Sequence, residues 1–247
     1  MGPRAKPAYD IDKIKFATGS PTWERAVELY ERGKVTRFQD NQHSFSAMVI
    51  GTSPYEVLVS AEKFDVGSCT CYLGHKEELC KHLVALAIRA VTGGSPLSEK
   101  DRKMVIFPES SNRKGVLGKS ELSSVRSAIS DAMRYIKAYS GSSRTWFAYQ
   151  ASLMEGCNRL AALFSDLPVS EQTAQLIVQT LLRLDEKLCR GGVDDSDGTV
   201  GGLIEGAVDM LIKYAELDPA CIGAFQTLKG RSTCFDWEEP LLNLVSH

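Results

Sequence analysis

Three cysteines and one histidine in the first third of the chain have the types and the spacing of a metal site. Cys69, Cys71, Cys80 and His82 form the pattern Cys-x-Cys-x8-Cys-x-His. Thiolate sulfur and imidazole nitrogen are the ligands that suit tetrahedral Zn2+. Because these four side chains would fill every coordination position, we expect one structural zinc ion and no catalytic metal.

The spacing also predicts how the chain must be folded around the ion. Residues i and i+2 of an extended strand point to the same side, so Cys69 and Cys71 would present both sulfurs together. Residues two apart in a helix point about 200° apart. We therefore expect Cys80 just before a helix and His82 in its first turn, where free amides favour a thiolate. His75 in the spacer is an alternative ligand, but choosing it would leave His82 without a role.

A helix and a small sheet are predicted to position these residues. Residues 20–33 indicate a helix in which Ser20 is the N-cap and Gly33 is the left-handed stop. From His82 the apolar residues keep a 3.6-residue period until Gly93, which predicts a second helix. Short segments rich in Val, Phe, Ile and Tyr, separated by turn-forming residues, predict an antiparallel meander with strands at 34–38, 45–50, 55–60 and 67–71.

This region resembles the SWIM zinc finger, whose pattern is Cys-x-Cys, a variable spacer and Cys-x-His. The resemblance covers roughly residues 20–92 and includes the helix ending at Arg32-Gly33-Lys34-Val35, the strand turn Gly51-Thr-Ser-Pro54, and the apolar helix after Cys80-Lys-His82. It implies a zinc-binding adaptor, because SWIM fingers are associated with DNA-processing, chromatin, transposition and ubiquitin-ligase proteins. The rest of the chain matches no family by its motifs.

The remainder of the chain is predicted to be helical. Residues 93–119 are rich in Gly, Ser, Pro, Lys and Asn and are typical of a linker, so we expect a zinc-binding domain at 1–92 and an all-α domain at 120–247. The fold class is then α+β, with the second domain a helical bundle or a helical-repeat stack. Its helices are expected near 120–139, 144–165, 170–190, 199–216, 219–229 and 237–245.

The net charge and its distribution give little support for a dedicated nucleic-acid-binding protein. The net charge is −2, with 19 Lys and Arg against 15 Asp and Glu in residues 1–130, and 10 against 16 in residues 131–247. Lys76, Lys81 and Arg89 beside the zinc motif are candidate phosphate contacts. The neighbouring Glu77 and Glu78 favour an ordinary solvated face instead. We therefore expect a protein partner, with DNA as the alternative, and no small-molecule substrate.

Composition favours a cytoplasmic protein, or a nuclear one in a eukaryote. No run approaches the roughly 20 apolar residues of a membrane span, and the first residues show no apolar leader. In a chain of this kind, the cysteines outside the zinc motif are expected to be reduced and mostly buried. They are Cys157, Cys189, Cys221 and Cys234.

No catalytic constellation is visible, so an enzyme is the second hypothesis. It would need an unrecognised acidic site in the helical domain, for which Asp185, Glu186, Asp194 and Glu205 are the candidates. The run 194–198 fails as a calcium loop and is better explained as a helix-capping segment in which Asp197 precedes a helix. Phe235 and Trp237 near the C-terminus are expected to form a lid on the bundle, with a docking patch as the alternative.

Overall fold

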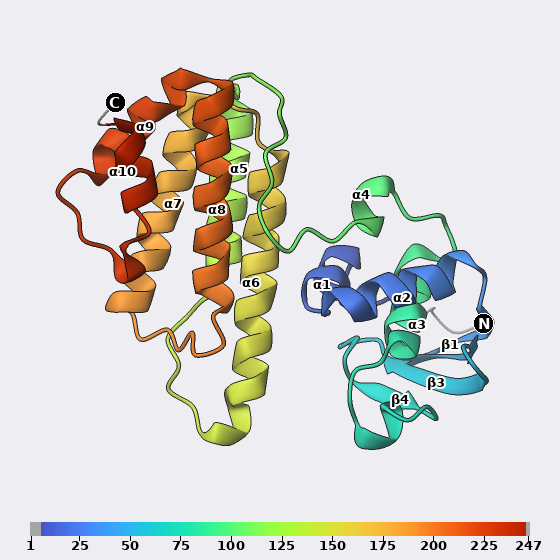
Figure 1. Cartoon of the computed structure of the whole chain (residues 1–247). Helices are drawn as coiled ribbons and strands as arrows, with labels where there is room; N and C mark the ends of the chain where they lie inside the picture. The colour runs from blue at the N-terminus through green and yellow to red at the C-terminus, as the bar shows by residue number, and fades with distance from the viewer. Residues whose placement is uncertain (1–5, 246–247) are drawn as a thin grey trace. The chain divides into compact units, whose positions relative to one another are not determined.

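The computed structural model describes residues 6–245 and divides the chain into two compact units, Met1–Met104 and Val105–His247 (Figure 1). We call them the N-terminal unit and the helical unit. Their boundary falls within the glycine- and serine-rich segment 93–119. Leu97 and Met104 contact the core of the N-terminal unit, whereas Lys114 forms a bridge with Val169 in the helical unit.

The N-terminal unit contains a four-stranded antiparallel sheet in the order β1-β2-β3-β4, as the meander pattern predicted. Burial alternates along β2, with Phe45, Ala47 and Val49 facing the core and the residues between them on the outer face. A bulge interrupts β1, where Arg37 has a φ of 51°. The strands are β1 (Val35–Asn41), β2 (Ser44–Ile50), β3 (Pro54–Ser60) and β4 (Gly67–Cys69).

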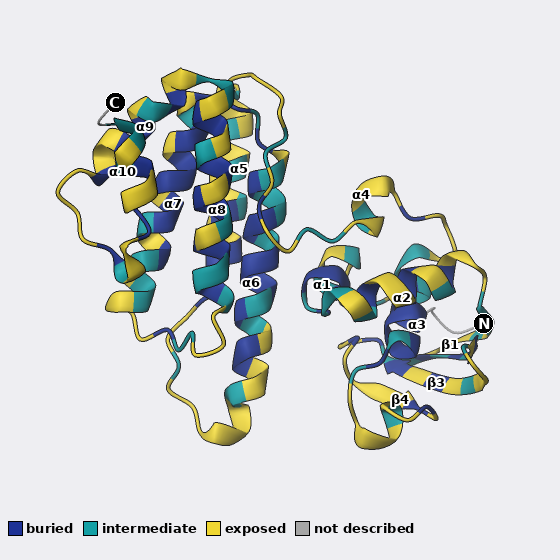
Figure 2. Cartoon of the chain, in the orientation of Figure 1, coloured by how far each residue is buried: buried dark blue, intermediate teal, exposed yellow. Residues whose placement is uncertain are grey.

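A buried helix, α3 (Lys81–Thr92), lies at the centre of this unit. It contacts β2 and β3 of the sheet, and also α1 (Ile11–Phe16) and α2 (Ser20–Glu31). Every residue from His82 to Ile88 is buried, because both sides of the helix are covered (Figure 2). This is why the segment is apolar all round instead of having a single apolar face.

Details of the helix ends differ from the expectations. Gly19, not Ser20, is the N-cap of α2, because Ser20 is already helical and bonds Glu24 within the same helix. Gly33 does have the predicted left-handed conformation, with a φ of 65°. The short helices α1 and α4 (Glu99–Arg102) were not predicted.

The helical unit is made of four long helices completed by short ones. Helix α8 contacts both α6 and α7, while α5 packs on α6. Their shared core contains large fully buried side chains such as Phe164, Leu160 and Tyr214. The long helices are α5 (Lys119–Met133), α6 (Trp146–Asp166), α7 (Glu171–Cys189) and α8 (Thr199–Leu217), and the short α-helices are α9 (Ile222–Phe225) and α10 (Glu239–Val245).

The acidic segment before α8 is a capping loop, as expected. Asp197 accepts a hydrogen bond from the amide of Thr199, and Asp195 accepts bonds from the amides of Val200 and Gly201. These bonds satisfy amides that have no partner within the helix. Among residues 6–245, no helix combines the length and the apolar character needed to cross a bilayer.

Candidate metal centre

The structure brings the four predicted ligands together. Cys69, Cys71, Cys80 and His82 are all buried, and one ligand atom from each lies within 4.8 Å of the others. Cys69 Sγ and His82 Nδ1 lie 3.7 Å apart. A buried group of three sulfurs and one ring nitrogen could hold a metal ion.

The second ligand pair lies where the spacing placed it. Cys80 is the N-cap of α3 and has extended backbone angles, while His82 is the second residue of the helix. This change of backbone conformation turns both side chains toward one point, although a regular helix would direct them apart. The helix amide of Leu83 also faces the Cys80 sulfur.

The first ligand pair differs from the simple strand geometry. Strand β4 ends at Cys69, so Cys71 lies in a bend beyond it and not in the strand. The backbone amide of Gly74 donates a hydrogen bond to Cys71 Sγ at 3.3 Å. A Cβ atom at Gly74 would lie 2.0 Å from the Cys69 carbonyl oxygen, so the bend closes tightly only with glycine there. The two sulfurs are therefore brought together by a turn and not by the pleat.

The ring of His82 is held in one orientation by its neighbours. The Tyr55 ring lies against it, with the ring centroids 4.5 Å apart. A Cβ atom added to Gly51 would come within 2.7 Å of His82 Nε2, so the backbone approaches that edge closely. Among the described residues Nε2 has no hydrogen-bond partner. The ring therefore directs Nδ1 toward the sulfurs and buries its other nitrogen against Gly51.

The sulfurs are coupled electrostatically. Interaction with the Cys69 side chain, with His82 and with the Leu83 amide lowers the pKa of Cys80 to about 4. That interaction with Cys80 raises the pKa of Cys69. In a buried site without a cation, one thiolate thus opposes ionisation of the next. A bound cation would remove this opposition by compensating the charge of all three sulfurs.

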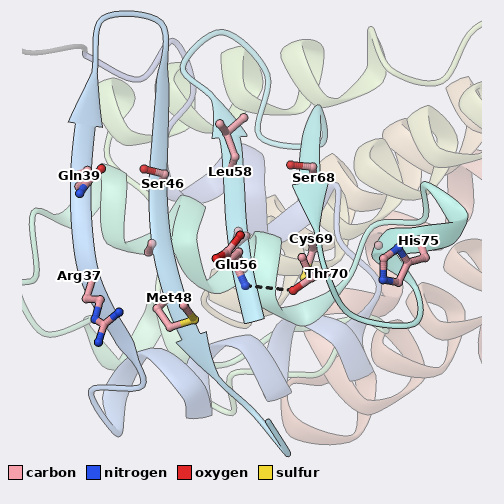
Figure 3. Close-up of a pocket in the computed structure, with 13 residues that line it drawn as sticks. Arg37, Gln39, Ser46, Met48, Glu56, Leu58, Ser68, Cys69, Thr70 and His75 are labelled. Atoms are coloured by element: carbon pink, nitrogen blue, oxygen red, sulfur yellow. Dashed lines mark hydrogen bonds between the residues drawn. The ribbon is translucent and has the colours of Figure 1, made fainter. Parts of the chain in front are cut away.

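His75, the alternative ligand, lies outside this cluster. It is exposed on the 3-10 helix η1 (Gly74–Lys76) and lines the hollow on the outer face of the sheet (Figure 3). Its backbone amide donates to the Cys71 carbonyl, so its main chain helps to shape the bend. The structure therefore assembles the cluster with His82.

The three basic residues considered as phosphate contacts do not form one group. Lys76 lies over the Tyr72 ring, with its Nζ atom 4.5 Å from the centroid. Lys81 begins α3 beside the ligands. Arg89 is two turns further along α3, about 12 Å by the helix rise, and its guanidinium lies 5.0 Å from the centroid of the Phe38 ring. Only Lys76 and Lys81 are near the cluster.

Two further residues near the ligands were not singled out from the sequence. Arg25 of α2 and the exposed Tyr72 line a hollow of about 230 Å3 together with Lys81, Cys71 and His82. Arg25 is 46 residues from Cys71 in the sequence. Spacing alone could not have connected it with the ligands, because the packing of α2 on α3 brings it there.

The four candidate carboxylates of the helical unit do not come together in one group, although Asp185 and Glu186 line the same hollow. Asp185 accepts hydrogen bonds from the Cys234 amide and from Trp237 Nε1, and Asp194 accepts one from Trp146 Nε1. Glu205 is on the exposed side of α8. In the part of the chain that the structure describes, no group of three or more ligand-type side chains contains two of these four carboxylates.

One expectation about the remaining cysteines was wrong. Cys157 and Cys221 are free and buried, but Cys189 and Cys234 form a disulfide. Cys189 is exposed at the end of α7, and the two cysteines are 45 residues apart in sequence. Their pairing depends on the return of the C-terminal segment to α7, for which the local sequence gives no signal. Asp185 lies beside both sulfurs.

Comparison with protein-family models, with curated proteins and with solved structures finds no match to this chain. The resemblance to the SWIM finger therefore rests on the ligand pattern and on the segments around it.

Proposed function

We propose that this protein is a structural zinc-binding adaptor whose N-terminal unit contacts a macromolecular partner. The observation that supports this most directly is the closed Cys3His cluster. Zinc bonds of about 2.3 Å to sulfur and about 2.0 Å to nitrogen, at the tetrahedral angle, separate the two ligand atoms by about 3.5 Å. The 3.7 Å between Cys69 Sγ and His82 Nδ1 is close to that value.

The donor set favours zinc and a structural role for it. Three thiolates and an imidazole discriminate against Mg2+ and Ca2+, which prefer oxygen ligands. Four protein ligands leave no coordination position for water or substrate, which a catalytic zinc ion requires. The ion would supply charge compensation and a cross-link between β4, the bend after it and the start of α3.

The outer face of the sheet supports a protein partner. Met48 and the 40 % exposed Leu58 lie on this face between polar residues, with Arg37 on β1 and Glu56 on β3 (Figure 3). The hollow there has a volume of about 580 Å3. Met and Arg are enriched in protein interfaces relative to the rest of the surface, so Met48 and Arg37 on this face favour a protein partner.

The test is to measure metal content and partner capture in the same sample. Purified untagged protein should contain one zinc ion per chain, and capture from the native source should yield a stoichiometric partner. Leu58→Glu should lose that partner and keep its zinc. Val116→Glu is the matched control, because Val116 is exposed on the helical unit. A metal-free chain, or equal capture by Leu58→Glu, would contradict the proposal.

DNA binding is the second candidate, and the hollow beside the ligands favours it. Arg25 and Lys81 line this hollow with Tyr72, and Lys76 lies over the same ring. Basic side chains can contact phosphate groups, and an exposed aromatic ring beside them can stack on a base. Affinity for single- and double-stranded DNA should then fall steeply with salt, and Arg25→Ala should reduce the slope by about one. Binding that is independent of ionic strength would exclude phosphate contacts.

An enzyme is not part of this proposal. Two of the four candidate carboxylates accept bonds within the helical unit, Asp185 from Trp237 and Asp194 from Trp146. Asp185 and Glu186 line one hollow, but Asp185 is already bonded to the Cys234 amide and to Trp237, which does not favour general acid and base chemistry there. We therefore propose a binding protein. Catalytic turnover of a substrate that is lost on substitution of Glu205 would overturn this choice.

A further inference from the structure

A groove on the helical unit lies apart from the residues that carry the proposed function. One side is the N-cap Gly198 and the first half of α8 as far as Asp209, and the other runs from Cys234 into the first turn of α10 at Pro240. Its volume is about 670 Å3. The apolar residues of the lining include Ile204 and Val208 on the α8 side and Phe235, Trp237 and Pro240 on the other side. The two sides of the groove belong to elements that contact each other in the fold (Figure 1).

One side of the groove projects a large apolar side chain into solvent. Phe235 is 84 % exposed, although the expectation for it and Trp237 was a lid on the bundle. Trp237 does behave as a lid, since it is buried, but Phe235 does not. Phe235 and Asp236 both have positive φ angles, 63° and 53°. Two successive non-glycine residues in this region are unusual, and they turn the Phe235 side chain away from the core that holds Trp237.

This side is also fixed in place. The Cys234 amide donates to Asp185 at 2.7 Å, and Trp237 Nε1 donates to the same carboxylate at 3.0 Å. The disulfide joins Cys234 to Cys189 of α7. Phe235 is therefore an exposed aromatic side chain between two anchored neighbours. Such a fixed group binds a partner at a low entropic cost, because little further ordering is needed.

The charge around the groove has one sign. Asp195, Glu205, Asp209 and Asp236 line it, and none of its lining residues is Lys, Arg or His. Glu205 and Asp209 are exposed one turn apart on α8, and Asp236 is exposed on the opposite side. Asp195 already accepts two helix amides. Three exposed carboxylates around an apolar lining complement a cationic segment that also has an apolar side chain.

We infer that this groove binds a basic peptide segment of a partner protein. An apolar side chain of that segment would pack between Phe235 and Val208, and its Lys or Arg side chains would pair with Glu205, Asp209 and Asp236. The inference goes beyond the proposed function and does not depend on zinc, because every residue of the groove belongs to the helical unit.

The test uses the full chain and two synthetic peptides of equal length, one built of Lys and Leu and the other of Glu and Leu. Glu205→Lys/Asp209→Lys reverses the charge of the groove. Gly201→Leu fills it, and a Cβ atom at Gly201 meets only Asp195 Oδ2 within 4 Å, at 3.4 Å. The matched control is Glu186→Lys/Glu216→Lys, which makes the same charge change at exposed positions that do not line the groove.

We expect the Lys/Leu peptide to bind the wild type, and both groove variants to weaken its binding at least tenfold. The control double variant should change it less than threefold, and the Glu/Leu peptide should not bind. Circular dichroism verifies that each variant keeps the wild-type helical content. Failure of the wild type to bind the Lys/Leu peptide, or equal weakening by the control, would overturn the inference. So would a wild-type dimer that Gly201→Leu dissociates, because the occupant would then be a second copy of the chain.

Discussion

The cores of the two units are built from different kinds of side chain. In the N-terminal unit, the core cluster contains three cysteines, and His82 is buried beside them. In the helical unit the core is a continuous cluster of aliphatic and aromatic side chains contributed by all the long helices. Polar ligand groups in a core are costly unless they are paired or bound to metal. The first core therefore contains a cluster that could hold a metal ion, and we propose that this core is complete only when the ion is bound.

The position of the ligands makes this difference important for the whole N-terminal unit. Helix α3 begins at Cys80 and contacts the sheet and both α1 and α2. Loss of the ligand cluster would therefore affect the element on which every layer of the unit packs. The four long helices of the helical unit begin at residues outside any ligand cluster of the described chain, so we expect the stability of this unit to be independent of metal.

Replacing a ligand should have the largest effect and should separate the two units. Cys80→Ala removes one of four zinc bonds, and binding of structural zinc to finger peptides is worth on the order of 10 kcal/mol. We expect residues 20–92 to unfold while the helical unit keeps its far-ultraviolet signal. Thermal denaturation followed by circular dichroism, with zinc quantified in parallel, measures both.

His75→Ala is the control for this experiment, because His75 is exposed beside the bend and lies outside the ligand cluster. It should keep one zinc ion and the wild-type transition. Chelation of the wild type should reproduce Cys80→Ala. Loss of all helicity in Cys80→Ala would show that the two units do not fold independently.

A cavity in the core of the helical unit should destabilise that unit and leave the N-terminal unit unchanged. Phe164 is fully buried in the helical unit, and Phe164→Ala should cost about 3–5 kcal/mol of that unit's free energy of unfolding. Zinc content should not change. Phe147→Ala is the control, since Phe147 is 77 % exposed on α6. Release of zinc by Phe164→Ala would contradict the separation of the two cores.

Removal of the disulfide should lower the stability of the helical unit by less than the core cavity does. It closes a loop of 45 residues, and cross-links of this size contribute about 2–4 kcal/mol by restricting the unfolded chain. Cys189→Ser should lower the urea midpoint of the helical unit under oxidising conditions. Under reducing conditions the variant and the wild type should have nearly the same midpoint. An equal difference under both conditions would mean that the cross-link does not contribute.

Loss of a helix cap should have the smallest effect on stability. Ser170 is the N-cap of α7, and its hydroxyl accepts a hydrogen bond from the Thr173 amide at 3.3 Å. Ser170→Ala should cost the helical unit about 1 kcal/mol. Ser127→Ala is the matched control, because Ser127 is exposed inside α5, where alanine is the better helix former. If both variants melt alike, the cap bond contributes nothing.

The ligands could be predicted from the sequence because their information is local. Cys69, Cys71, Cys80 and His82 lie within 14 residues, and the change from strand to helix between them is visible in the apolar pattern. The long helices of the second unit were predictable for the same reason. The position of Cys71 was less predictable, because the bend depends on the close approach of Gly74 to the Cys69 carbonyl.

Features that depend on distant contacts could not be predicted. The disulfide joins residues 45 apart, and Arg25 reaches the ligands only through the packing of α2 on α3. The helix α4 has four residues, too few for a periodic pattern. Phe235 and Trp237 are aromatic residues two positions apart, yet the positive φ angles of Phe235 and Asp236 leave Phe235 exposed while Trp237 is buried and bonded to the distant Asp185.

The start of α3 at a ligand determines where the chain tolerates a change of length. One residue inserted between Cys80 and His82 would rotate the following helix by about 100° relative to the ion, which would turn its seven successive buried side chains out of their places. The spacer is also constrained, because Glu77 has a left-handed φ of 59° and the amides of Glu77 and Glu78 donate to the carbonyls of Gly74 and Leu73. A change of chain length on either side of Cys80 should therefore separate the ligand pairs, which loss of bound metal would report.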